Sequence, residues 1–124
     1  MSIGSKLKPI TTASLMANLN VFADGNPDFR RELAELIINN IHELQDTASR
    51  LGSEDGLEEF AQTAHKIKTS LKILGDDEFQ DVIESIKTEL EKGDSQKAQE
   101  HIKNFNAIGA KLMDDLKEVI EAEV

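Results

Sequence analysis

The residues of this chain that are best suited to chemistry stand close together, at His65, Lys66, Lys68 and Lys72. Free imidazole has a pKa of about 6.5, so near pH 7 an exposed ring is largely neutral and offers a lone pair as a nucleophile without a separate base. Lysine ammonium groups beside such a ring attract negative charge. Because the chain as a whole is acidic but has no acidic residue at positions 60–75, this segment is a local reversal of charge and predicts a place for an anion.

The spacing of these residues puts most of them on one face of the helix that the segment is expected to form. From Leu57 to Leu74 the apolar residues recur at steps of three and four, which is typical of a helix with one buried stripe. His65 lies about 130° around the helix from that stripe, so we expect its ring to be exposed. The residues expected around it are Ala61, Gln62, Lys66, Lys68, Thr69 and Lys72.

A solvated surface is the ordinary role of an exposed histidine flanked by lysines. We expect that role for the other two histidines, His42 and His101, which each lie one position off an apolar stripe. Helical bundles that bind two metal ions carry Glu-x-x-His on two helices, but Asn39 and Ala98 stand three residues before these histidines. The chain also has no cysteine. We therefore expect no metal site.

The sequence lacks the motifs of the common enzyme classes. It contains no glycine-rich phosphate loop, no Gly-x-Ser-x-Gly nucleophile elbow and no His-Glu-x-x-His run. Without a nucleotide-binding loop the chain has no means of taking a phosphoryl group from ATP. We therefore expect no kinase activity and no cofactor, and an enzymatic or metal-binding helical bundle has little support.

Residues 64–75 resemble the phosphoacceptor helix of histidine-containing phosphotransfer (HPt) domains, whose pattern is Ala-His-x-Leu-Lys-Gly-Ser/Ala followed by Leu-Gly. Thr69 departs from the pattern, because the family usually has glycine at this position, one turn after the histidine. A small residue keeps the space beside the phosphorylated nitrogen open, so the threonine either turns its hydroxyl toward the phosphoryl group or narrows that space. The residues in register with the pattern are His65, Lys68, Ser70, Leu74 and Gly75.

Two more segments extend the resemblance over nearly all of residues 12–120. Residues 25–29 (Gly-Asn-Pro-Asp-Phe) look like the start of the family's second helix, and residues 91–94 (Glu-Lys-Gly-Asp) look like the turn between its last two helices. The resemblance therefore implies that residues 1–124 form a single HPt-like helical domain.

The resemblance also implies a function, that of a phosphorelay intermediate in two-component signalling. His65 would accept a phosphoryl group from the aspartyl phosphate of a receiver domain and pass it to another response regulator, while Lys68 would stabilise the charge on the phosphoryl oxygens. The implied partners are response-regulator receiver domains and a hybrid sensor histidine kinase, and any Mg²⁺ would belong to the receiver. The residues around the phosphoryl group or against the partner would be Ala61, Gln62, Lys66, Thr69 and Lys72.

The same residues are also compatible with a different class of function, namely binding without phosphorylation. A helical interaction module that is never phosphorylated would use the cationic face formed by Lys66, Lys68 and Lys72 to dock a receiver or another acidic partner. Thr69 at the usual glycine position keeps this alternative open. Phosphorylation of His65 separates the two interpretations.

Five helices are expected to position these residues, because prolines and glycines divide the chain and do not interrupt its apolar stripes. Four are long and joined by short connections, so we predict an all-α fold, an antiparallel up-down-up-down four-helix bundle with an additional short N-terminal helix. The predicted stripe of the second helix is Phe29, Leu33, Leu36, Ile37, Leu44, Ala48 and Leu51. The helices are expected at residues 12–22, from Pro27 to Leu51, from a cap at Ser53 to Leu74, from Asp76 or Asp77 to Gly93, and from Asp94 or Ser95 toward the C-terminus.

Length and charge limit the possibilities further. A chain of 124 residues fits one domain, with residues 1–10 expected to be a flexible tail. The formal charge of −10 argues against binding to nucleic acid or to an anionic membrane. Since there is no cysteine and no run of eighteen apolar residues, we expect a cytoplasmic protein with no membrane segment. We also expect a monomer.

Overall fold

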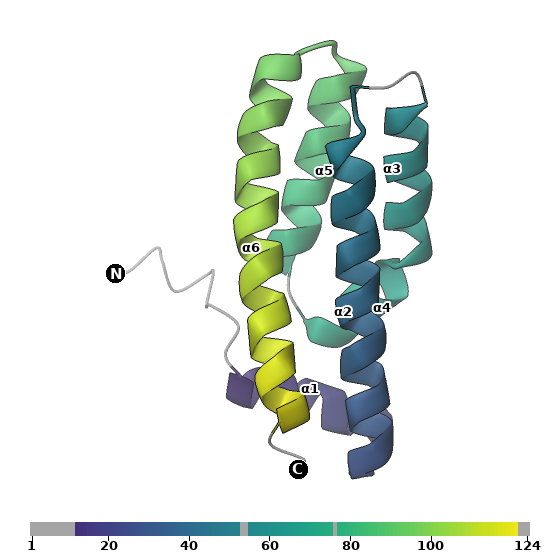
Figure 1. Ribbon diagram of the computed structural model, residues 1–124, viewed down its shortest axis with the longest axis vertical. Helices are drawn as coiled ribbons and strands as arrows, with labels where there is room; N and C mark the ends of the chain where they lie inside the picture. The colour runs from purple at the N-terminus through teal and green to yellow at the C-terminus, as the bar shows by residue number, and fades with distance from the viewer. Residues whose placement is uncertain (1–11, 53–54, 76, 122–124) are drawn as a thin grey trace, which may run out of the picture.

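The computed structural model of the protein describes residues 12–52, 55–75 and 77–121. Within them the chain forms six α-helices and no strand, which confirms the predicted all-α class (Figure 1). The predicted tail at residues 1–10 and the predicted caps Ser53 and Asp76 lie outside the described residues. The helices are α1 (Thr12–Ala23), α2 (Pro27–Ser49), α3 (Gly56–Lys66), α4 (Lys68–Leu74), α5 (Asp77–Glu91) and α6 (Ser95–Glu121).

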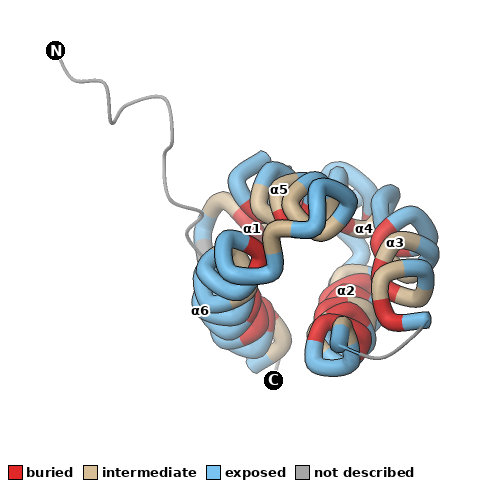
Figure 2. Tube along the Cα trace, turned by 90° about the horizontal axis from the view of Figure 1, so that it is seen from above, coloured by how far each residue is buried: buried red, intermediate tan, exposed pale blue. Residues whose placement is uncertain are grey.

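The helices α2, α3, α5 and α6 run along the long axis of the molecule, and α1 crosses beneath them at one end (Figure 1). α5 packs against α6, α2 packs against both α6 and α3, and α3 meets α5. Seen from above, these helices turn their buried residues toward a shared interior (Figure 2). α1 contacts α2, α4 and α6 and buries Leu15, Leu19 and Ala23. The short N-terminal helix is therefore part of the core.

Local signals in the sequence explain where the helices begin and end. The side chain of Asn26 accepts a hydrogen bond from the backbone N–H of Phe29 at 3.1 Å, and Pro27 follows at the first helical position, which confirms the predicted start of α2. Asp94 caps α6 in the same way, accepting from the N–H of Lys97 at 3.0 Å. The short side chains at these caps satisfy N–H groups that have no partner inside the helix.

Three phenylalanines fix the spacing between α3 and α5. Phe60 of α3, Phe79 of α5 and Phe105 of α6 are each 0% exposed. The ring of Phe105 stacks on that of Phe79 with centroids 5.2 Å apart and meets Phe60 edge to face at 6.0 Å. Both arrangements are favourable for aromatic pairs. Because one ring of α6 contacts both of the others, α6 holds α3 and α5 at a set separation.

The buried face of α2 differs from the predicted one. Phe29 and Leu36 belong to the predicted stripe but are 44% and 51% exposed, so that part of the prediction is wrong. The buried side of the helix is centred on Ile37 and Ile41, and the two exposed residues lie about 100° around the helix from it. Their spacing of seven residues forms a second apolar row, which none of the described helices covers.

The third predicted helix is also different, because it is not continuous. It is divided at Ile67, which has φ −92° and ψ 4° and stands between the last residue of α3 and the first of α4. Residues 66–70 (Lys-Ile-Lys-Thr-Ser) include two β-branched residues and a serine, which favour helix weakly. Packing also favours the bend, because Ile67 and Leu71 are buried and α4 packs against α1.

We predict that Phe105→Ala destabilises the protein by about 3–5 kcal/mol, because it removes the ring that lies between two others in a fully buried position. Phe105→Leu is the control, since it keeps most of the apolar volume and should cost less. Urea unfolding followed by far-ultraviolet circular dichroism measures both variants. Equal stability of Phe105→Ala and the wild type would show that the aromatic cluster does not hold the helices together.

Candidate functional site

The predicted site lies at the division between α3 and α4. His65 stands in the last turn of α3 and Lys68 is the first residue of α4, and both are exposed, as predicted. The predicted position of His65 in the middle of a long helix is wrong, because Ile67 ends α3 two residues later. Residues on the two sides of the bend therefore do not share one continuous helical face.

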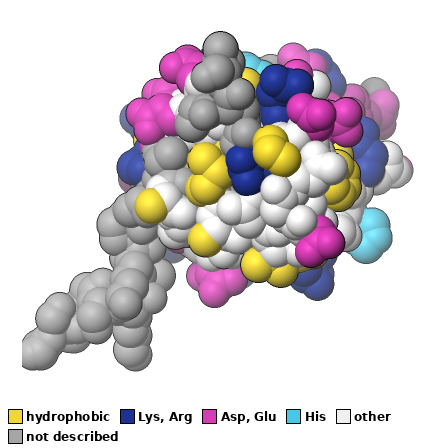
Figure 3. Space-filling view, turned by 90° about the horizontal axis from the view of Figure 1, so that it is seen from below, with side chains coloured by type: hydrophobic (Ala, Val, Ile, Leu, Met, Phe, Trp, Pro, Cys, Tyr) yellow, Lys and Arg dark blue, Asp and Glu magenta, His cyan; other side chains and the backbone are white. Residues whose placement is uncertain are grey.

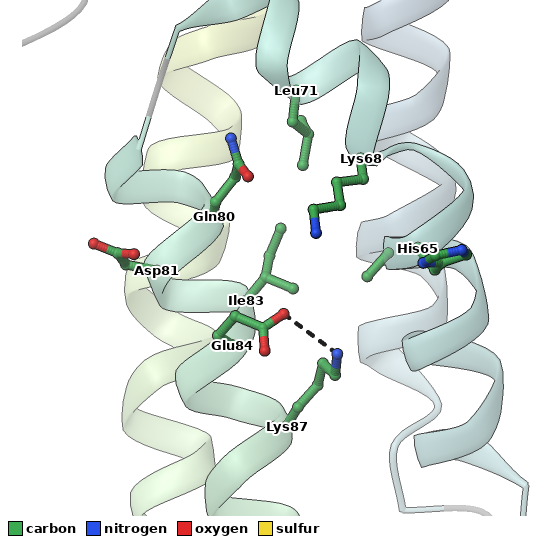
Figure 4. A pocket seen from close by; sticks show the side chains of 9 residues that line it. His65, Lys68, Leu71, Gln80, Asp81, Ile83, Glu84 and Lys87 are labelled. Atoms are coloured by element: carbon green, nitrogen blue, oxygen red, sulfur yellow. Dashed lines mark hydrogen bonds and ion pairs between the residues drawn. The ribbon is translucent and has the colours of Figure 1, made fainter.

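A groove of about 410 Å³ separates this region from α5. Its floor is apolar, formed by Ala64, Leu71 and Ile83, and its rim is polar. His65 and Lys68 stand on one side of the groove, and α5 supplies the other side (Figure 4). The polar residues that α5 contributes are Gln80, Asp81, Glu84 and Lys87.

The charged side chains of the groove point in different directions. The side chain of Lys68 extends over the groove toward α5, while the His65 ring stays on the α3 side (Figure 4). Lys87 reaches into the groove from the opposite wall, and its Nζ lies 3.3 Å from Oε2 of Glu84. Asp81 directs its carboxylate away from the groove (Figure 4). The groove is thus bordered by one lysine from each wall, whereas the His65 ring is turned away from it on the α3 side (Figure 4).

Lys66 does not belong to this groove. Its Nζ lies 2.8 Å from Oε2 of Glu43 on α2, and the two side chains are 61% and 44% exposed. An exposed pair of this kind is screened by solvent and contributes about 0–1 kcal/mol to stability. The predicted cationic face is therefore partly neutralised, because Glu43 and the acidic residues of α5 approach it from other helices.

The remaining predicted residues lie around the groove without lining it. Gln62 donates a hydrogen bond to Oε1 of Glu58 at 3.2 Å, and Ala61 is half-buried one turn before His65. Thr69 and Lys72 are exposed on α4 and are not among the described residues that line the groove. Of the predicted residues, the structure therefore brings together only His65 and Lys68 at the groove.

Polar contacts hold α4 in the position that aims Lys68 over the groove. The side-chain amide of Asn40 on α2 donates to Oγ of Ser70 at 2.9 Å, which joins the start of α4 to α2. At the other end, Nδ2 of Asn18 on α1 donates to the carbonyl oxygen of Leu74 at 2.7 Å. Gly75 then ends α4 with φ +72°, a conformation that favours glycine.

The other histidines lie far from this arrangement in the sequence and on other helices. His42 is exposed on α2, which agrees with the prediction. His101 is partly exposed on α6, with 34% of its side chain exposed and its Nε2 4.0 Å from Oε2 of Glu89, so it is less solvated than a free surface ring. Among the described residues, no three histidine, aspartate or glutamate side chains form a group that could hold a metal ion.

Comparison of the chain with protein-family models, with curated proteins and with solved structures found no match. None of the helices in residues 12–52, 55–75 and 77–121 has the length and apolar character that crossing a membrane requires.

We predict that Asn40→Ala loosens α4, because it removes the side-chain hydrogen bond that joins Ser70 to α2. Amide hydrogen exchange of residues 68–74 should become faster, and the free energy of unfolding should fall by about 0.5–1.5 kcal/mol. Asn39→Ala is the control, since Asn39 is exposed and one position away. Unchanged exchange across α4 in Asn40→Ala would contradict the proposed role of this contact.

Proposed function

We propose that this protein is a phosphorelay intermediate, in which His65 accepts a phosphoryl group from a receiver-domain aspartyl phosphate and passes it to a second response regulator. The observation that carries the proposal is an exposed His65 at the edge of a groove whose rim also holds Lys68. The resemblance of residues 64–75 to the HPt phosphoacceptor helix supports the same residues in the same roles.

The packing of the long helices supports the matching architecture. α2, α3 with α4, α5 and α6 would form an antiparallel up-down-up-down four-helix bundle of the HPt kind, with α1 across one end. In support, α2 contacts α3, α3 contacts α5, α5 contacts α6, and α6 contacts α2, so that the contacts close into a ring. Such a bundle presents the phosphoacceptor on its outer surface, where another protein reaches it.

The chemical step requires little from the protein beyond position and charge. A ring nitrogen of His65 attacks the phosphorus, a P–N bond forms, and the P–O bond to the aspartate breaks, so that the receiver recovers a free carboxylate. The other ring nitrogen keeps its hydrogen. Lys68 would move its ammonium toward the phosphoryl oxygens, whose charge needs a nearby cation. The Mg²⁺ that assists such a transfer would be supplied by the receiver.

Exposed apolar residues on α2 supply a docking surface for the receiver. Leu36 is 51% exposed and lies one helical turn before Asn40, which contacts Ser70 of α4. Phe29 is 44% exposed and lies two turns before Leu36 on the same face. A partner centred on His65 would therefore meet this apolar row beside α4, and burial of the row's apolar surface would stabilise the complex.

The alternative is a binding module that docks a receiver or another acidic partner without being phosphorylated. Two observations favour it. The groove contains the carboxylate of Glu84, and Lys66 is paired with Glu43, so the site holds less free positive charge than its lysines suggest. Cellular location in the cytoplasm and a monomeric state fit either function and form part of the proposal.

We predict that the wild-type protein acquires acid-labile phosphate when it is mixed with phosphorylated receiver domains, and that His65→Gln acquires none. His42→Gln is the matched control, because it removes an exposed imidazole from α2 and should be labelled like the wild type. Transfer of radiolabelled phosphate followed on gels measures all three proteins. Labelling of His65→Gln, or no labelling of the wild type by any of a panel of receivers, would favour the binding module.

We predict that Lys68→Ala slows this transfer about tenfold, which corresponds to a loss of about 1.4 kcal/mol of transition-state stabilisation. Lys66→Ala is the matched control, because Lys66 is paired with Glu43 away from the groove and its loss should leave the rate nearly unchanged. Rapid-quench kinetics with a phosphorylated receiver measures both rates. If the two variants transferred at the same rate, Lys68 would have no special role.

We predict that Leu36→Ala weakens binding to a receiver about tenfold while leaving stability almost unchanged, because the side chain is half exposed in the free protein. Val21→Ala is the control, since Val21 is 77% exposed on α1. Titration calorimetry gives the affinity and urea unfolding gives the stability. A receiver that bound both variants as tightly as the wild type would place the docking surface elsewhere.

A further inference from the structure

The wall of the groove opposite His65 contains a second lysine that is positioned like a ligand-binding residue. Lys87 is 28% exposed, less than half the exposed fraction of Lys66, and its ammonium points into the groove from α5 (Figure 4). A lysine side chain held in a partly enclosed position loses conformational freedom, so some interaction has to hold it there. In the structure that interaction is the ion pair with Glu84 at 3.3 Å.

The charges around the groove show why an anion would have to displace a side chain. Lys68 and Lys87 supply two positive charges, and Asp81 and Glu84 supply two negative charges. Asp81 points away from the groove into solvent, where screening reduces its effect, whereas Glu84 points inward beside Lys87 (Figure 4). Glu84 is thus the carboxylate that competes with an incoming oxyanion for the lysines.

We propose that the groove is an oxyanion subsite in which Lys68 of α4 and Lys87 of α5 bind the phosphoryl oxygens from opposite sides. Glu84 is its internal counter-ion, which holds Lys87 in the groove until an oxyanion replaces the carboxylate. The link between this subsite and phosphotransfer rests on the proposed function of His65. Binding of a free phosphate ion to the two lysines does not depend on that function.

This arrangement explains the orientation of Lys68. Its side chain extends over the groove toward α5, the helix that carries Glu84, and opposite charges attract (Figure 4). In the space-filling view from below, lysine and arginine side chains also stand beside acidic ones at that end of the molecule (Figure 3). Binding of an oxyanion would leave Glu84 free to turn into solvent from the exposed face of α5, where the side chain is already 69% exposed.

A titration with inorganic phosphate at constant ionic strength tests the subsite. The amide NMR shifts of residues 64, 68 and 87 report phosphate binding. Lys87→Gln should weaken phosphate binding at least about threefold, and Glu84→Gln should strengthen it at least about threefold, as expected for exchange of one partly exposed ion pair. The matched controls are Lys92→Gln and Glu78→Gln, which remove the same charges near α5 from residues outside the groove and should bind phosphate like the wild type.

Two outcomes would overturn the subsite. The first is equal phosphate affinity for Lys87→Gln and the wild type. The second is a change in Glu78→Gln as large as that in Glu84→Gln, which would show an effect of net charge only. The phosphate titration uses no receiver. If receivers fail to phosphorylate the wild type while Lys87→Gln and Glu84→Gln shift phosphate affinity as expected, the subsite is supported and the phosphorelay proposal is the one that fails.

Discussion

The contact on which the candidate site most depends is the packing of Phe105 between two other rings. Its ring touches Phe60 of α3 and Phe79 of α5. These two helices carry residues of the two walls of the groove. Phe60 lies five residues before His65, and Phe79 lies next to Gln80 at the groove's edge. A smaller residue at position 105 would let the walls approach, and a larger one would force them apart. The width of a solvent-exposed groove is therefore set from inside the core.

Because of the bend at Ile67, His65 and Lys68 lie on two different helices, and each helix is held in place by its own contacts. α3 is held by Phe60 and Ala64 in the core, whereas α4 is held by Asn40 and by the burial of Leu71 and Leu74. Reorienting Lys68 toward His65 requires rotation of one exposed side chain and leaves both anchors in place. A site built this way keeps its histidine fixed while its cation moves.

The sequence was sufficient for the helical class, for the caps at Asn26 and Asp94, and for the exposure of His65 and Lys68, because each depends on local periodicity or on one side chain. It was insufficient where packing against distant segments of the chain determines which residues are buried or share a site. The apolar spacing of Phe29 and Leu36 fits a buried stripe as well as an exposed row, and only the positions of other helices separate the two.

Glu84 and Lys87 were missed because they belong to the site only through packing of α5 against α3. Their one sequence signal, polar residues at positions 80, 84 and 87 along one face of α5, is common on any solvated helix.

The hydrogen bond from Asn18 to the carbonyl oxygen of Leu74 has a consequence for how the chain can be shortened. A Cβ placed on Gly75 would come within 3.0 Å of the same Asn18 amide, so the turn that ends α4 and the middle of α1 fit against one another closely. Truncation of the first helix would remove the Asn18 hydrogen bond and the packing of α1 against α4, the segment that bears Lys68. The part of the chain that holds α4 in place thus includes α1, which precedes the first of the four long helices.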